Sequence, residues 1–199
     1  MIIAFMLSFF VMEITVANEE KQEHMVQREL AEEVLRFHVR ANSDKEEDQE
    51  IKMRVKSVVV AYLQKILQEV DSKGQASHLV MLHKKEISKV IAKQLQKENC
   101  TYGFEIQIQK EWFPQRTYGD CTFPKGVYEA VIISLGKGRG QNWWCMIYPG
   151  LCFLDETYAV VSKENKEDLE DRLSDETYAW VINPDHIKVS YRFKWLHWK

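Results

Sequence analysis

GKGRGQNWWCMIYPGLC, residues Gly136–Cys152, is the stretch around which the rest of this chain is organised. Three glycines alternate with two cations at its start, and Gly138 and Gly140 are free to adopt the backbone conformations of a tight connection. Trp143 and Trp144 are adjacent, so in a strand their side chains point to opposite faces of the sheet. The pattern predicts a hairpin in which one tryptophan is buried and the other is free to meet a partner.

Several segments outside this loop have the period-two pattern of strands. Val127–Leu135 is rich in β-branched residues and is predicted to pair with Gln141–Tyr148 across the glycine-rich loop. Val34–Ala41 and Tyr102–Gln109 alternate apolar with polar residues, which predicts strands with one wet face. Ile187–Trp195 alternates in the same way and is read as a final strand.

Between these strands the period changes to that of helices. Two amphipathic helices are predicted over Asp44–Val70 and Ser77–Lys97, with Gly74 ending the first. Ser43 and Asp44 each precede a glutamate by three residues, the spacing of a capping box, so the acidic run after them indicates a helix start rather than a metal site. The predicted fold is α+β, with two amphipathic helices packed on one face of a largely antiparallel sheet.

The chain divides into four predicted parts. Met1–Val16 is nearly all apolar apart from Glu13, which favours a signal-like or membrane-anchoring leader at residues 1–17 over a buried helix or strand, although the usual basic residues are absent. Residues 18–33 read as a polar linker or solvated helix, and residues 34–154 as the core domain. Residues 155–199 form a C-terminal extension with a short helix at Lys163–Leu173 and the final strand.

Composition and motifs disfavour several classes of function. The 199 residues carry a net charge of -3, which gives no reason to expect nucleic acid as a partner. The histidines match no metal motif, and no nucleophile is identifiable beside His38, so a hydrogen-bonded histidine is favoured there over a general base. Gly136–Gly140 lacks the spacing of a dinucleotide-binding loop. We therefore predict no enzyme, no catalytic residue, no metal, no cofactor and no small-molecule substrate.

The four cysteines form no metal-binding pattern. Cys145 and Cys152 flank a Pro149-Gly150 turn, and we predict that they form a disulfide in an exported protein, with two buried free thiols as the alternative. Nothing local brings Cys100 and Cys121 together, so their pairing stays open.

Three runs of this sequence resemble one known family. GRGQNWWC…PGLCF, FPKGVYEAV and LRFHVRANSDKEEDQEIK are similar to the stage II sporulation protein R family over roughly Val34 to Leu154. The resemblance implies a non-enzymatic signalling protein of endospore-forming bacteria, exported from the forespore into the space between forespore and mother cell. There it would activate the membrane-embedded aspartic protease stage II sporulation protein GA, which cuts the precursor of the mother-cell sigma factor E.

On this interpretation the loop and the neighbouring turn contact the protease. The expected contact residues are polar or aromatic side chains from two motifs: Gln141, Asn142, Trp143, Trp144, Asn42 and Asp44. An exposed tryptophan flanked by carboxamides also suits stacking on a sugar ring, so the alternative function is an extracytoplasmic module that binds cell-wall carbohydrate. A hydrolase acting on the cell envelope is a third, less favoured class.

Overall fold

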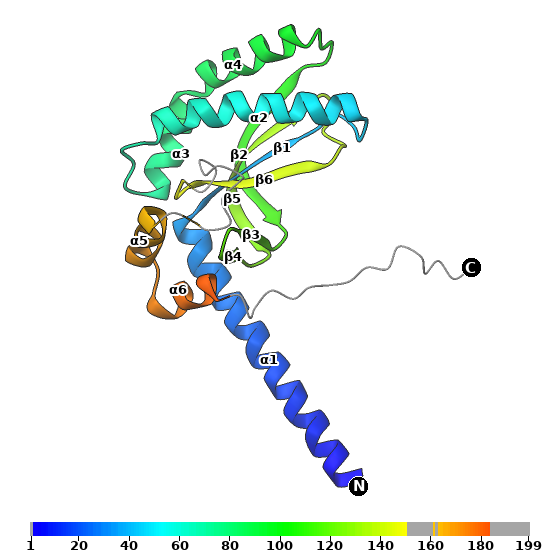
Figure 1. Ribbon diagram of the computed structural model, residues 1–199, viewed down its shortest axis with the longest axis vertical. Coiled ribbons are helices and arrows are strands. Elements are labelled where there is room, and N and C mark those ends of the chain that lie inside the picture. Colours follow the sequence, from blue (N-terminus) through cyan, green and yellow to red (C-terminus); the bar gives the residue numbers. More distant parts are fainter. Residues whose placement is uncertain (1, 151–160, 162, 184–199) are drawn as a thin grey trace, which may run out of the picture.

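The structure of the chain, a computed structural model, describes residues 2–150, 161 and 163–183, with side chains described from residue 18 onward. A four-stranded sheet has α2, α3 and α4 on one face, while the end of α1, the β3–β4 hairpin, α5 and α6 lie at the other (Figure 1). The helices are α1 (Ile2–Glu33), α2 (Glu46–Ile66), α3 (Lys73–Leu82), α4 (Lys84–Lys97), α5 (Lys163–Arg172) and α6 (Asp175–Ile182). The strands are β1 (Leu35–Arg40), β2 (Phe104–Phe113), β3 (Arg116–Tyr118), β4 (Cys121–Phe123), β5 (Gly126–Leu135) and β6 (Asn142–Tyr148).

The predicted α+β class is confirmed, and the sheet is mixed. Its order is β2-β5-β1-β6, with β2 antiparallel to β5, β5 parallel to β1, and β1 antiparallel to β6. Two of the three pairings are antiparallel, which agrees with the expected character of the sheet.

The predicted β5–β6 hairpin is wrong, because β1 lies between the two strands and pairs with both. The glycine-rich loop instead passes over the end of β1. It is held there by backbone hydrogen bonds from Gly140 N to Ala41 O at 2.9 Å and from Arg139 N to Asn42 O at 3.3 Å. The turn signal was correct, but a local signal does not specify which strand fills the space between the two that it joins.

The helical region differs from prediction in three places. Gly74 lies inside α3, which starts at the Ser72 cap, where the hydroxyl accepts from Gln75 N at 3.2 Å. The predicted Ser77–Lys97 helix is two helices that meet at His83, whose Nδ1 pairs with the Tyr62 hydroxyl at 2.8 Å. The predicted capping box is also wrong, because α2 begins after Lys45 with no side-chain cap.

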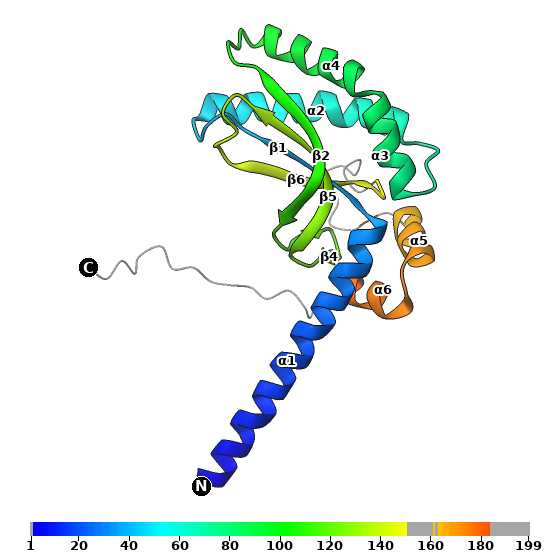
Figure 2. The same ribbon diagram turned by 180° about the vertical axis from the view of Figure 1, so that it is seen from behind.

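The apolar leader and the stretch predicted as a linker form one helix, α1 (Figure 2). Its last turns enter the domain, where Val26 and Leu30 are buried. Among helices whose side chains are described, none is long and apolar enough to cross a membrane.

β1 is buried on both faces, so the solvent-exposed face predicted from its alternation is wrong. The central position of β1 places Phe37 and Val39 in the core under α2–α4 and the polar side chains in a second core. That second core is completed by residues from α5 and α6.

The C-terminal extension is partly as predicted. The short helix is confirmed as α5, whereas α6 was not predicted from the sequence and follows a Ser174 cap that accepts from Thr177 N at 3.3 Å. The strand predicted at Ile187–Trp195 lies outside the described residues.

Candidate functional site

The two motifs singled out in the sequence meet at one end of the sheet, hereafter the tip: Asn42–Asp48 and Gly136–Asn142. Asn42 Oδ1 accepts from Lys137 N at 3.0 Å, and Asp44 Oδ1 accepts from Gln141 N at 2.7 Å. Lys52 Nζ reaches Gln141 O at 3.2 Å from the first half of α2. Side chains of the turn thus bind the backbone of the loop.

Glycines allow the loop to approach the turn this closely. A Cβ at Gly140 would lie 2.2 Å from Ser43 O and 2.9 Å from Ala41 Cβ. Gly136 has φ of 55°, which favours glycine, and a Cβ there would lie 2.3 Å from Asn42 Oδ1. Gly136 and Gly140 therefore allow the close contact between the loop and the turn.

Asp48 is the internal anchor of the tip. Its carboxylate is 7% exposed and accepts from Asn42 Nδ2 at 2.9 Å, from Tyr102 Oη at 2.8 Å and from the Ser43 hydroxyl. Burial acts to raise the pKa of Asp48, but these hydrogen bonds and the charge of Lys45 outweigh it, so the pKa lies below its ordinary value. Asp48 belongs to the acidic run that predicted a helix start, and that pattern gave no signal for this role.

The predicted contact residues fall into two groups. The side-chain oxygens of Asn42 and Asp44 are used inside the tip. The Gln141 side chain is exposed, since the tip binds only its backbone, and Asn142 is half-buried. Arg139 is exposed on the same loop and was not among the predicted contacts.

Trp143 and Trp144 point to opposite faces, as predicted, but both are half-buried, so the expected division into one buried and one exposed ring is wrong. Trp143 meets Phe37 edge-on at 5.9 Å and lies under Lys56 Nζ at 4.8 Å. Trp144 stacks on His38 at 4.6 Å. The free ring face that carbohydrate stacking needs is not offered by the pair, whereas Trp112 on β2 is 55% exposed.

The other face of β1 carries a feature that sequence analysis missed, hereafter the basic chamber: Arg36, His38, Arg116 and the aromatic rings around them. Arg36 is 0% exposed, and its Nε, Nη1 and Nη2 have no hydrogen-bond partner among the residues that the structure describes. Its guanidinium carbon lies between 4.7 and 5.8 Å from four ring centroids, those of Phe113, Tyr118, Phe123 and Tyr128.

Burying an unpaired cation in this environment costs free energy. An unpaired buried charge costs several kcal/mol, and a desolvated cation–π contact returns about 2 kcal/mol. Burial accordingly lowers the pKa of Arg36, and the nearby Arg116 acts in the same direction. A guanidinium nevertheless stays protonated in proteins, so Arg36 is a buried cation.

His38 lies two residues further along the same face and is also 0% exposed, and neither ring nitrogen is hydrogen-bonded to any residue of the described ranges. Burial, assisted by the charge of Arg40, lowers the pKa of His38 to about 3. It is therefore neutral at pH 7, and the hydrogen-bonded histidine expected from the sequence is not what the structure contains.

Coiling of the sheet closes the basic chamber. β2 is separated from β1 by β5, yet Phe113 at the end of β2 lies 5.4 Å from His38 and 4.8 Å from Trp144. Glu111 likewise pairs with Arg40 at 2.9 Å. The end of β2 thus folds over the face of β1, the β3–β4 hairpin that follows supplies the Tyr118 and Phe123 rings, and β5 supplies Tyr128.

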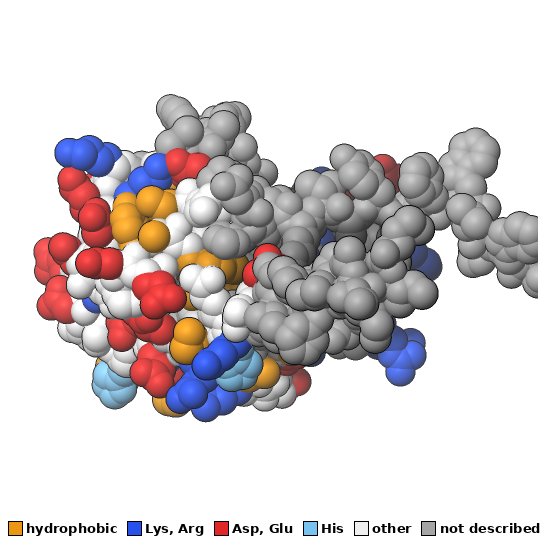
Figure 3. Space-filling view, turned by 90° about the horizontal axis from the view of Figure 1, so that it is seen from below, with side chains coloured by type: hydrophobic (Ala, Val, Ile, Leu, Met, Phe, Trp, Pro, Cys, Tyr) orange, Lys and Arg blue, Asp and Glu red, His pale blue; other side chains and the backbone are white. Residues whose placement is uncertain are grey.

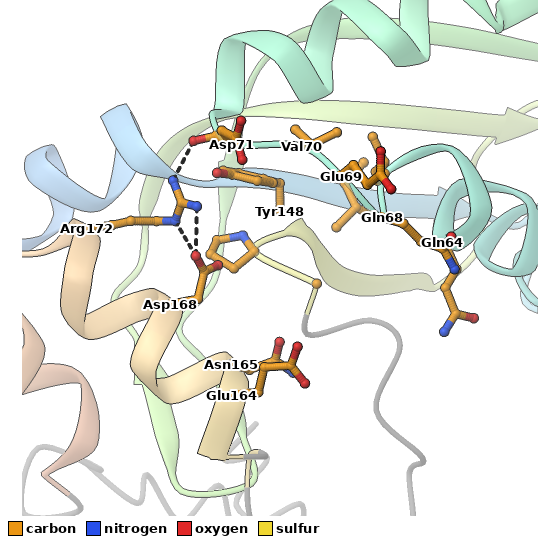
Figure 4. A pocket seen from close by; sticks show the side chains of 14 residues that line it. Gln64, Gln68, Glu69, Val70, Asp71, Tyr148, Glu164, Asn165, Asp168 and Arg172 are labelled. Atoms are coloured by element: carbon orange, nitrogen blue, oxygen red, sulfur yellow. Dashed lines mark hydrogen bonds and ion pairs between the residues drawn. The ribbon is translucent and has the colours of Figure 1, made fainter.

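A pocket of 480 Å³ lies where the end of α2, the end of β6 and α5 meet (Figure 4). Arg172 crosses it, pairing with Asp168 at 2.7 Å and donating to Asp71 O at 2.7 Å, with its guanidinium 5.0 Å from the Tyr148 ring centroid. Burial raises the pKa of Tyr148 to about 12. The rest of the polar lining is acids and carboxamides, which supply no nucleophile with an adjacent base: Gln64, Gln68, Glu69, Glu164 and Asn165.

Two of the cysteines have known states. Cys100 and Cys121 are free thiols, and burial raises the pKa of Cys121 to about 11, so that thiol is not a reactive nucleophile. Cys145 is buried on β6, while Cys152 lies outside the described residues, so their pairing stays a prediction.

Within the described residues no three metal-binding side chains gather in one place. Acidic and basic side chains are mixed over the face seen in Figure 3, which fits the small net charge of the chain.

Comparisons with a family model and with a curated relative both identify the same family. Residues 31–158 match the family model described as stage II sporulation protein R. The stage II sporulation protein R of Bacillus subtilis (strain 168) is 32% identical over 140 residues, which cover 69% of this chain and 62% of the relative. The chain thus spans somewhat less than two thirds of that relative's length. No solved structure matches.

Proposed function

The chain belongs to the stage II sporulation protein R family, and on this premise we propose that it is the non-enzymatic signal that activates a membrane-embedded aspartic protease like stage II sporulation protein GA. The family gives it a role in sporulation signalling. Export from the forespore and activation of the protease that processes the sigma E precursor are the proposed steps. The apolar start of α1 supports export through a leader.

The observation that carries the proposal is the tip. The two longest family-like motifs, more than 90 residues apart, are joined there by side chain-to-backbone hydrogen bonds. Their internal polar groups are used for this construction, so the loop has a defined shape with the Arg139 and Gln141 side chains outward. A rigid loop with free donors loses little conformational entropy on binding, which suits a recognition element.

We further propose that Cys145 and Cys152 form a disulfide in the exported protein. The other two cysteines are free thiols, so they do not compete for this pairing. Closing this short loop would stabilise the fold by about 2–3 kcal/mol in the chain-entropy model. Alkylation of the native secreted protein followed by mass mapping tests it, and labelling of both thiols without reductant would refute the pairing.

The activity test mixes the purified chain with membranes that contain the protease and follows cleavage of the sigma E precursor. The double variant Arg139→Ala/Gln141→Ala removes two exposed side chains and leaves the backbone contacts of the tip in place. We expect at least a tenfold loss of potency with unchanged thermal unfolding, because contact residues at an interface centre commonly carry about 2 kcal/mol.

The matched control is Lys110→Ala/Gln109→Ala, which removes one exposed cation and one exposed glutamine from β2. Full activity of both double variants would show that the tip is not the contact surface. Binding of muropeptides by the parent chain without any activation of the protease would instead favour the carbohydrate-binding alternative.

A further inference from the structure

Unpartnered buried polar atoms are concentrated in one place. In the part of the chain that the structure describes, eight buried side-chain nitrogen or oxygen atoms have no hydrogen-bond partner, and seven of them belong to Arg36, His38, Arg116 and Tyr118. Native proteins satisfy most such groups, so a cluster of this kind points to a missing ligand or ion. All four residues contribute to the basic chamber.

The chemistry of these atoms specifies what is missing. Guanidinium nitrogens only donate, and the Tyr118 hydroxyl and one nitrogen of neutral His38 also donate. Three acids of the neighbouring segments are paired with other cations: Glu111 with Arg40, Asp120 with Lys166, and Glu23, whose charge acts on Tyr128, with Lys125. Among the described residues the chamber therefore holds a buried positive charge and several donors without an acceptor, and the complementary group is an anion.

We propose that the basic chamber is a binding site for a small organic carboxylate, held by the Arg36 guanidinium. The planar guanidinium matches a carboxylate through two parallel hydrogen bonds. The rings of Phe113, Phe123 and Tyr128 form apolar walls for the organic body of the ligand, which an inorganic anion would leave unused. The rings pack directly on the guanidinium, and a small molecule needs less space among them than a side chain carried by a polypeptide backbone.

Entry requires an opening, because Arg36 is fully covered. The β3–β4 hairpin supplies the Tyr118 and Phe123 rings of the cover and is joined by only three residue pairs. The hairpin forms its own two-stranded sheet, so it can open without breaking the central sheet, but buried β4 must then part from its neighbours in the second core. The hairpin is thus the element that must move for a ligand to enter. Its closure over a bound carboxylate would order the hairpin.

The site lies beside the second residue of β1, whereas the tip begins after the other end of this strand. The proposal therefore does not rest on protease activation, and either idea can fail alone.

Thermal unfolding of the full chain in sodium benzoate and sodium acetate, compared with sodium chloride at equal ionic strength, tests the proposal. At about ten times Kd we expect Tm to rise by roughly 3–5 °C and to keep rising with the logarithm of carboxylate concentration. Arg36→Met should abolish the rise, and Arg28→Met, at an exposed arginine of α1, should retain it.

Side-chain NMR of the parent gives a second readout that does not depend on a variant that folds. Addition of benzoate should shift the Arg36 Nε–Hε resonance along a saturable curve, with a Kd that agrees with the one calculated from the rise in Tm. An unchanged resonance together with an unchanged Tm would overturn the proposal, and so would an equal rise in Tm in Arg36→Met.

Discussion

The tip and the basic chamber use polar residues of neighbouring segments in opposite ways. At the tip the buried Asp48 carboxylate accepts three hydrogen bonds, and the turn and loop around it are held by further ones. In the basic chamber Arg36 is more deeply buried and makes no hydrogen bond. Buried polar groups that are hydrogen-bonded fix the local shape, whereas those without a partner keep the capacity to bind a ligand. The tip is therefore a preformed surface, and the chamber is an incomplete site.

The largest expected effect is at Asp48. Asp48→Ala leaves donors from Asn42, Ser43 and Tyr102 without their acceptor, and we expect the free energy of unfolding in urea to fall by about 3 kcal/mol. Glu47→Ala is the control, because Glu47 is an exposed acid in the same helical turn and should change stability by less than about 0.5 kcal/mol. Equal losses in the two variants would mean that only the helix dipole matters at this position.

The next effect tests the close approach at the tip. In Gly140→Ala the new methyl group would lie 2.2 Å from Ser43 O, so loop and turn must separate, and we expect a loss of about 2 kcal/mol. Gly103→Ala has open space and should be neutral or slightly stabilising. Chemical denaturation measures the free energy of unfolding of both variants. An unchanged value in Gly140→Ala would show that the tip is not tightly packed.

A smaller effect concerns pH and the chamber. His38 has a folded pKa of about 3 against an ordinary value of 6.5, so as pH falls below 6.5 the unfolded chain binds a proton that the folded chain does not. Stability contributed by neutral His38 is therefore full above pH 6.5 and lost on acidification, by about 1.3 kcal/mol between pH 7 and pH 5.5.

The charged groups near His38 are Arg40, with its ion-pair partner Glu111, together with Arg36 and Arg116. Denaturation of the parent and of His38→Phe at both pH values isolates the contribution. If the two proteins lose the same stability, His38 is not the titrating group.

The smallest change is expected at Arg36, despite its burial. Arg36→Met removes an unpaired charge and leaves an apolar side chain of similar length among aromatic rings, so stability should stay within about 1 kcal/mol of the parent or rise. The stability changes of Arg36→Met and Asp48→Ala therefore test the difference between the chamber and the tip most directly. A loss above about 3 kcal/mol in urea would show that Arg36 has a structural counter-charge and that the chamber is complete.

Local features of the fold followed from the sequence. Period-two alternation located β1, β2, β5 and β6, and the 3.6-residue period located the helical layer, because each pattern reflects the face that an element buries. Adjacency alone placed Trp143 and Trp144 on opposite faces. Two motifs also sufficed for the family, since the glycine, cation and tryptophan run and the RANSD run are unusual in composition.

What the tertiary structure decided is which neighbour each element meets. Only the sheet order put β1 between β5 and β6 and so replaced a hairpin by a loop that crosses to the Asn42 turn. Only the coiling of β2 over β1 buried Arg36 and His38, which the alternation had placed in water. Alternation shows that the two faces of a strand differ in polarity. Whether the polar face is exposed to solvent depends on chain segments far away in sequence and on how they pack against it.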